Sequence, residues 1–419
     1  MSFQQGLSGL DAAATALDVI GNNVANASTV GFKSANANFS DVFAASLGIA
    51  GASQVGIGVA VSAIQQQFSQ GNLTTTNNTM DLAINGGGFF RMSDDGAISY
   101  TRNGQFHLDK EGYVVNDQQL RLTGYPAGVD GLISASSPVE LQLSANQIPP
   151  RATSDPLAGD LGAVLNLDSR DTAPLVAFDP AVPGSYNFAT ALTVFDTLGV
   201  SHNLSTYYVL QPPAVPPAGN QWFVYATLDG ANPVGGAVNF ATLGFTNTGT
   251  LIPQVPPPQL PQWNLSNGAV TPWRPGRMDF TGSTQFGSAS TADSLTQGGY
   301  TSGNLTGVGV GSDGILQGRY SNGQTRNMGQ LVLATFSDPN GLLNLGNNQW
   351  SASPVSGPEL IGAPASGSRG VIQSAAVEDS NVDLTQELVA MITAQRNYQA
   401  NAQTIKTQDQ IMQTLINLR

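Results

Sequence analysis

The sequence contains no cysteine, which excludes disulfide bonds, thiolate chemistry and cysteine-containing metal sites. Histidine occurs only as His107 and His202, and these two residues fall in different predicted domains. A metal site built from several histidines is therefore excluded, and a catalytic triad would need a geometry that the sequence does not support. The stability of the fold must come from packing and assembly.

Charge is also scarce: Asp, Glu, Lys and Arg make up 10% of the 419 residues, where about 25% is usual for soluble domains. Uncharged polar residues and 48 glycines take their place. Such a surface repels copies of itself only weakly and suits dense self-packing. On composition alone, an ordinary secreted protein of low charge is an equally good interpretation.

Basic residues and long apolar runs are both missing. The 15 lysines and arginines stand singly in a chain of net charge −13, so we expect no nucleic-acid binding. No apolar run approaches the roughly 18 residues of a membrane span, so we expect no membrane insertion. The first basic residue is Lys33, and the early apolar stripe is amphipathic, which argues against a cleaved signal peptide.

Long stretches with helical periodicity are present at the two ends of the sequence. Apolar residues recur there at steps of three and four, which is typical of coiled-coil seams. The N-terminal seam consists of Phe3, Leu7, Leu10, Ala14, Leu17 and Val24. The C-terminal seam consists of Leu384, Leu388, Met391, Tyr398, Ala402, Ile405, Met412 and Ile416. Because isolated helices are marginal, we expect both ends to be mobile in the monomer and ordered by neighbouring copies.

The sequence between the ends is rich in turns and short alternating runs, which predicts β-structure. Asp95-Gly96 and Asn103-Gly104 are typical hairpin turns. The composition shifts to Pro, Ala and Asp over residues 148–156, where a second β region begins. The predicted fold class is therefore mainly β with α-helical termini, in discontinuous nested domains: a terminal coiled-coil helix pair plus an inner and an outer β domain.

The predicted domains are nested around an insertion. Residues 1–33 and 381–419 form the terminal helical domain, 34–71 and 364–380 a connector, 72–147 and 285–363 the inner β domain, and 148–284 the outer β domain. The connector is expected to be extended or irregular, with one strand within residues 55–68, because it is small, polar and interrupted by glycines.

Motifs of catalysis or cofactor binding are weak. Gly86-Gly87-Gly88 is not followed by Lys and Ser or Thr, so it is interpreted as a close-packed turn instead of a phosphate loop. The carboxylate pairs Asp94-Asp95 and Asp168 with Asp171 are expected to form turns. The sequence predicts no catalytic, cofactor-binding or metal site, and the chain is not expected to be an enzyme.

Specific motifs at both ends resemble those of one family. The first is Ser8-Gly-Leu-Asp-Ala-Ala with Gly21-Asn-Asn-Val-Ala-Asn-Ala-Ser-Thr-Val-Gly31-Phe-Lys33, and the last runs from Asn381-Val-Asp-Leu to Thr404-Ile-Lys406. With Met80-Asp-Leu-Ala-Ile-Asn and Tyr100-Thr-Arg-Asn-Gly between them, these segments resemble the bacterial flagellar rod and hook proteins. The insert, which includes Thr193-Val-Phe-Asp-Thr-Leu-Gly199, is similar to the outer domain of the hook members. A rod or hook-filament junction role is the nearest alternative, and the length and the insert argue against it.

The resemblance implies a structural subunit that polymerises into the flagellar hook, a curved flexible tube that transmits torque from rod to filament as a universal joint. It also implies export of the unfolded chain through the flagellar type III apparatus to an extracellular location. The implied partners are other copies of the chain, the distal rod protein, the hook cap protein and the hook-filament junction protein. No cofactor is implied.

Two further sets of residues follow from the resemblance. The family motif contains Asn22, Asn23, Asn26, Gly31, Phe32 and Lys33. The residues themselves assign these no role beyond ending the helix and forming a turn. The hinge candidates, in paired linkers that would let rigid domains tilt as units, are Gly71, Ile148, Thr284 and Gly370.

An interpretation from another class stays open at this point. A secreted β-sandwich binding protein, such as an adhesin or a carbohydrate binder, would use the aromatic residues Trp222, Trp263 and Trp273 to line a groove.

Overall fold

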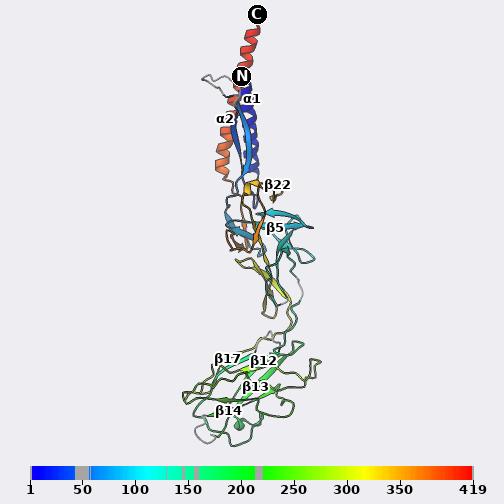
Figure 1. Ribbon diagram of the computed structural model, residues 1–419, viewed down its shortest axis with the longest axis vertical. Coiled ribbons are helices and arrows are strands. Elements are labelled where there is room, and N and C mark those ends of the chain that lie inside the picture. Colours follow the sequence, from blue (N-terminus) through cyan, green and yellow to red (C-terminus); the bar gives the residue numbers. More distant parts are fainter. Residues whose placement is uncertain are drawn as a thin grey trace. The chain divides into compact units, whose positions relative to one another are not determined.

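The computed structural model describes residues 2–42, 56, 58–128, 130–143, 147–154, 160–212 and 220–417, with the backbone alone at residues 2 and 415–417. The predicted seam residue Ile416 therefore lies outside the described side chains. The chain divides into two compact units. The first comprises Met1–Ala145, Thr306–Arg319 and Thr325–Arg419, and the second Asn146–Leu305 and Tyr320–Gln324. The fold is mainly β with a helix at each end, as predicted (Figure 1).

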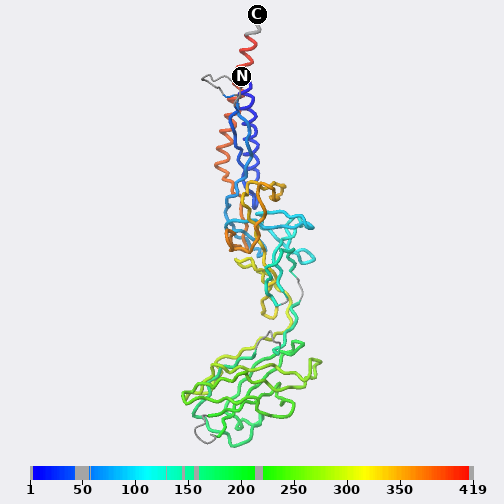
Figure 2. Tube along the Cα trace, in the orientation of Figure 1, coloured from blue at the N-terminus to red at the C-terminus, as the bar shows by residue number. Residues whose placement is uncertain are grey.

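The two long helices of the first unit lie side by side. Helix α1 spans Ser2–Ala25 and helix α2 spans Leu384–Asn417. In Figure 2 the blue start of the chain and its orange-red end run next to each other. Asp383 precedes α2 and its carboxylate accepts hydrogen bonds from the backbone N–H groups of Thr385 and Gln386, which caps the first turn of the helix.

A pair of strands packs against α1 in the predicted connector, where the sequence predicted a single strand within residues 55–68. Strands β1 (Ala35–Val42) and β2 (Gly58–Gln66) pair antiparallel, and both contact α1. The Ser8 hydroxyl accepts a hydrogen bond from the Val59 backbone N–H at 3.3 Å. Gly58 at the start of β2 leaves room for the helix, because an added Cβ there would clash with the Ser8 side chain.

The β body of the first unit is built around one large branched sheet. Its main path runs through eight strands: β18 (Leu305–Val310), β19 (Ile315–Tyr320), β20 (Thr325–Leu331), β9 (Arg121–Pro126), β5 (Phe89–Asp94), β6 (Ala97–Thr101), β23 (Gln349–Ser351) and β22 (Leu343–Gly346). The branches are β7 (His107–Leu108), β8 (Val114–Val115), β10 (Val139–Glu140), β21 (Leu333–Thr335) and β24 (Leu360–Gly362). The predicted turn at Asp95-Gly96 joins β5 to β6, with both residues at positive φ.

Two small sheets in this unit pair strands from the N-terminal part of the chain with strands that shortly precede α2. Strand β3 (Leu73–Thr75) pairs with β26 (Ala376–Glu378), and β4 (Leu82–Asn85) pairs with β25 (Val371–Ser374). The apolar core includes Phe90, Leu122 and Leu333, which are fully buried. Residues about 300 positions apart in sequence are therefore held side by side in these two ladders.

The second unit has its own core between two sheets. Strands β16 (Met278–Asp279), β11 (Leu161–Asn166) and β17 (Thr291–Thr296) form one sheet, and β12 (Phe188–Phe195), β13 (Ser201–Leu210), β14 (Gln221–Leu228) and β15 (Ala241–Gly244) form the other. The predicted outer-domain boundary at residue 284 differs from the structure, because β17 pairs with β11 and extends this unit to Leu305. β17 is polar and mostly exposed, so its sequence carries no alternating pattern that places it in this unit.

The exposure of α2 leads to a prediction about its order in the isolated chain. Ala394 is the one buried side chain of α2 among residues 384–414. We therefore expect amide exchange in α2 to be much faster than in β5 and β9, as for a marginally stable helix. Hydrogen-exchange mass spectrometry of dilute monomer measures this. Protection of α2 equal to that of the β core would contradict it.

Candidate functional site: the paired chain ends

Helices α1 and α2 run antiparallel and are in close contact at two glycines of α1. A Cβ added to Gly6 would lie 3.0 Å from the Ile405 Cγ1, and one added to Gly9 would lie 2.9 Å from the Asn401 side-chain amide. Ala13 continues this small-residue face and is buried. Close contact between the helices thus depends on the absence of side-chain bulk on α1.

The structure places the predicted N-terminal seam beside this contact face instead of at its centre. Phe3 and Leu7 are 52% and 45% exposed. The remaining four seam residues are half-buried: Leu10, Ala14, Leu17 and Val24. Sequence reasoning missed Gly6, Gly9 and Ala13 because it followed large apolar residues. The spacing of the small residues was the available signal.

The predicted C-terminal seam divides between two faces of α2. Three of its residues are half-buried, namely Met391, Ala402 and Ile405, and Ile405 meets α1 at Gly6. Four other residues of the predicted seam are exposed: Leu384, Leu388, Tyr398 and Met412. Leu384, Leu388 and Ile392 are spaced four residues apart, and Val389 lies next to them. We call these four residues the outer stripe of α2; they are 47%, 45%, 52% and 60% exposed respectively.

Asn23 from the family motif joins α1 to both neighbouring elements. Its amide pairs with the Ala35 backbone, accepting from the N–H at 2.9 Å and donating to the carbonyl at 2.9 Å. The same amide nitrogen donates to the Glu387 carboxylate on α2 at 3.0 Å. One buried side chain therefore fixes the hairpin, α1 and α2 together.

A buried ion cluster lies where the helices meet the β body. The Glu378 carboxylate, at the end of β26, contacts the Lys33 Nζ at 2.6 Å and the Arg102 guanidinium at 3.0 Å. The side chains of Lys33 and Glu378 are fully buried, and that of Arg102 is 4% exposed. Lys33 also donates to the Ser69 carbonyl, and the Gly71 N–H donates to Glu378. Three segments distant in sequence converge on one carboxylate.

Burial makes the charged state of the two basic residues in this cluster costly. Burial lowers the pKa of Lys33 below its ordinary value, and the Glu378 carboxylate opposes that shift. Burial also lowers the pKa of Arg102, again opposed by Glu378. Two cations share a single anion, so the buried charge is balanced only in part, and removal of the carboxylate would leave two cations without a counter-charge.

The other motif residues end α1 and direct the chain into the β body. The Asn26 backbone N–H and side-chain amide both donate to the Asn22 carbonyl. Gly31 has φ +71 and donates its N–H to the Glu378 carbonyl at 2.7 Å, while a Cβ there would lie 2.6 Å from the Asn103 nitrogen. Phe32 is half-buried in the same turn. These positions therefore support the path that brings Lys33 to Glu378.

The four hinge candidates occupy different environments. A Cβ at Gly71 would lie 2.0 Å from the Asp379 carbonyl oxygen, and one at Gly370 would lie 2.4 Å from that of Asn85, so both glycines sit in close-packed backbone. Thr284 lies inside the second unit, where its N–H donates to the Leu165 carbonyl. Ile148 is beside the division between the units. The packing argues against bending at Gly71, Gly370 and Thr284.

The tryptophans that the binding-protein alternative would use lie in a core. Trp222, Trp263 and Trp273 are buried in the core of the second unit at 3% exposure or less, so they cannot line a groove. His107 and His202 lie in different units. Within the described residues, no group of histidines and carboxylates is arranged to hold a metal ion. None of the helices that the structure describes combines the length and apolarity required to span a bilayer.

Comparison with known families agrees with this arrangement of ends and body. Residues 3–33 match the family model of flagella basal body rod proteins, and residues 373–418 match that of the flagellar basal body rod FlgEFG protein C-terminal region. Residues 83–155 match the flagellar hook protein FlgE/F/G D1 domain, and residues 166–300 the flagellar basal body protein FlaE D2 domain. The fold and these matches define a protein of the flagellar rod and hook class.

Individual relatives narrow this class. The chain is 42% identical over 428 residues to the flagellar hook protein FlgE of Escherichia coli (strain K12), covering 100% of both chains. It is 31% identical over 463 residues to that of Borreliella burgdorferi, covering 100% of this chain and 99% of the relative. The crystal structure of Helicobacter pylori flagellar hook protein FlgE2 has the same fold, with a TM-score of 0.50 and 12% identity over 72% of this chain and 99% of that chain.

The chain belongs to the flagellar hook protein FlgE family. It is a structural protein of the flagellar hook and not an enzyme.

The ion cluster generates a prediction about stability. Glu378→Gln keeps the shape of the side chain but leaves Lys33 and Arg102 without a counter-charge, so we expect a loss of about 3–5 kcal/mol in the free energy of unfolding. Lys33→Met leaves one cation facing one anion and should cost less. Denaturant unfolding of the full chain measures both.

A matched control is Glu111→Gln. Glu111 is exposed and lies 3.5 Å from the exposed Lys110, so its loss should cost less than about 1 kcal/mol. Equal effects of the changes at residues 378 and 111 would show that the cluster does not hold the junction.

Proposed function

We propose that the chain polymerises with copies of itself into the hook through its paired ends, that it is exported unfolded by the flagellar type III apparatus to the cell exterior, and that the resulting tube is a universal joint. The observation that carries the first part is the outer stripe of α2. Four large apolar side chains there remain 45–60% exposed in the described chain.

The outer stripe favours neighbouring copies as its partners. Covering a Leu or Ile side chain fully contributes about 1.5–3 kcal/mol relative to leaving it in water. A second apolar surface lies on α1 at Phe3 and Leu7. Both surfaces are elongated along the helices, which suits parallel packing of many helix pairs. We infer that α1 of one copy covers α2 of another.

The ends also support the proposed heterologous partners. Residues 3–33 and 373–418 match models that describe basal body rod proteins, so the helical segments are similar in rod and hook members. A shared type of helical surface would let the first hook copies pack on the distal rod protein and the last copies on the hook-filament junction protein. The hook cap protein would hold incoming copies while their helices become ordered.

The absence of cysteine supports export in an unfolded state. No disulfide can form, so no covalent crosslink blocks threading of the chain. Folding on arrival outside the cell would then depend on packing alone.

The universal-joint proposal rests on the two units. Each has its own apolar core, so each can move as a body while the chain between them changes conformation. Ile148 stays the hinge candidate beside the division. The low charge content lets copies slide without breaking strong ion pairs between them. Sliding and tilting together would let each row of copies lengthen and shorten as a bent tube rotates.

The assembly proposal predicts the effect of Leu388→Asp. Residue 388 is exposed, so the substitution should leave the fold unchanged but place a charge in the apolar interface and block polymerisation. Electron microscopy of cells and sedimentation of purified protein measure assembly. If export is correct, the variant should appear in the culture medium as monomer.

The matched control is Gln386→Asp, which adds the same charge to an exposed position of the same helix without removing apolar surface. Normal hooks from the variant at residue 388 would refute the assembly proposal, whereas retention of folded variant inside the cell would refute export.

The joint proposal predicts independent tumbling of the two units. The chain has four tryptophans: Trp350 is buried in the first unit, and the other three are buried in the second. NMR relaxation of the indole ¹⁵N nuclei in monomeric full-length protein should give different rotational correlation times for Trp350 and for the other three. One common correlation time would mean a rigid chain and contradict the joint.

A further inference from the structure

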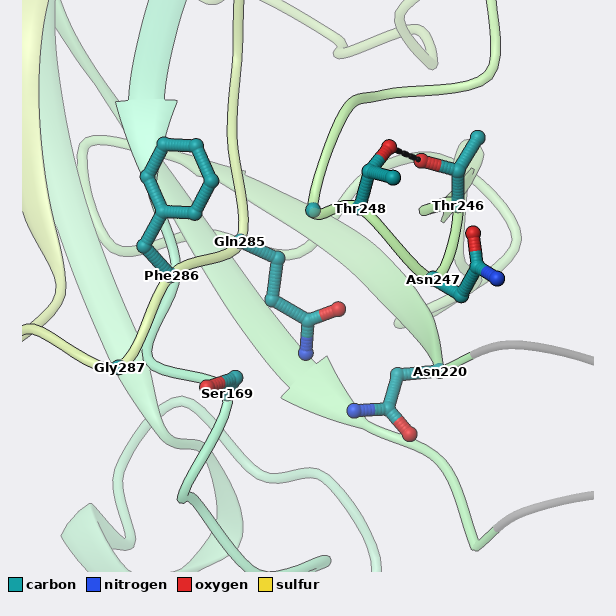
Figure 3. Close-up of a pocket in the computed structure, with 9 residues that line it drawn as sticks. Ser169, Asn220, Thr246, Asn247, Thr248, Gln285, Phe286 and Gly287 are labelled. Carbon is teal, nitrogen blue, oxygen red and sulfur yellow. Dashed lines mark hydrogen bonds between the residues drawn. The ribbon is translucent and has the colours of Figure 1, made fainter.

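The second unit has a polar hollow on its surface. It is bordered by the turn after β15, by the segment that precedes β17, and by single residues from two other segments (Figure 3). The lining residues are Ser169, Asn220, Thr246, Asn247, Thr248, Gly249, Gln285, Phe286 and Gly287. None of them is charged. The nearby Arg170 guanidinium is occupied by a bidentate pair with the Asp168 carboxylate at 2.9 and 2.7 Å.

The lining has a distinctive chemistry: three carboxamides, three hydroxyls and one aromatic ring. The hydroxyls of Thr246 and Thr248 bond to each other at 2.8 Å (Figure 3), and both also contact the Thr250 hydroxyl, which fixes the rim. Amides and hydroxyls can each donate and accept hydrogen bonds. The hollow is therefore suited to a neutral ligand that presents many groups of both kinds.

Gln285 supplies an unmatched donor at the floor. Its residue is 7% exposed, and its Nε2 is buried with no hydrogen-bond partner in the described structure. Figure 3 shows the amide directed between Ser169 and Asn220. A buried amide donor without an acceptor is costly, so a ligand that offers an acceptor to the Gln285 Nε2 would remove this cost.

Phe286 offers a flat apolar surface beside these polar groups. The ring is 50% exposed and lies against Gly249, where φ is +78 and an added Cβ would lie 2.8 Å from the ring Cε1. The Phe286 backbone N–H donates to the Asn166 side chain at 3.1 Å. The ring is thus held in place although one side remains open to solvent.

We propose that this hollow binds a neutral saccharide. Sugar hydroxyls both donate and accept, which matches the amide and hydroxyl lining, and the C–H face of a pyranose ring matches the open Phe286 ring. The lack of charge in the lining disfavours sulfated, phosphorylated or acidic ligands. The site lies within one unit and does not depend on the polymerisation proposed above.

The test uses full-length protein and two sets of probes. Methyl glycosides of glucose, mannose and galactose are examined by saturation-transfer NMR, and immobilised neutral and anionic oligosaccharides by array binding. We expect at least one neutral sugar to bind. If a methyl glycoside binds about as tightly as the oligosaccharides, the site is assigned to free sugars. If only oligosaccharides bind, the site is assigned to polysaccharide chains.

Two variants identify the hollow as the site. Asn247→Ala removes an exposed rim amide, and Gln285→Leu removes the buried donor; each should weaken binding by about tenfold or more. Gln285→Leu should not lower the Tm, which separates ligand contact from a structural role. The control is Asn232→Ala, at an exposed position of the same unit outside the hollow, which should bind normally.

Several results would overturn the proposal: no binding of any neutral saccharide, preference for anionic ones, or unchanged binding in the variant at residue 247. Because that variant alters only an exposed side chain, loss of folding does not complicate the result.

Discussion

The Glu378 carboxylate is the point on which the architecture of the first unit depends. Lys33 reaches it from the end of the N-terminal segment and Arg102 from the β body, while Glu378 itself precedes α2. Buried ion pairs contribute little net stability, because desolvation offsets their attraction, yet losing one partner is costly. The cluster therefore constrains how the segments meet more than it adds to the stability of the fold.

That constraint acts at the junction between the helices and the β body, where α1 has ended and α2 begins. In the segment that follows α1, Gly31 bonds to the backbone of Glu378 and Lys33 to its side chain. Within α1, Asn23 bonds to Glu387 near the start of α2. Polar contacts therefore join both chain ends to each other and to the β body of the first unit.

The parts that were predictable from the sequence are those with local signals. The helical stripes, the Asp95-Gly96 turn and the motif through Lys33 all belong to short stretches of sequence. Glu378 was not predictable, because its partner Lys33 is 345 residues away and no pattern near residue 378 indicates it. β17 was placed in the wrong domain because its exposed polar residues are ordered by pairing with β11. Non-local pairing decided each of these cases.

The prediction of the helical seams shows a different limitation. Periodicity identified the large apolar residues of α1, but the chain's own helix contact uses Gly6, Gly9 and Ala13, whose small size permits close approach. If Leu7 were turned toward α2, the helices would separate and the apolar surface available to other copies would shrink. Small residues therefore lie inside the helix pair, whereas Phe3 and Leu7 stay exposed outside it, where the assembly proposed above would cover them. A monomer that buried both kinds of residue would be more stable alone, and association would bury less apolar surface.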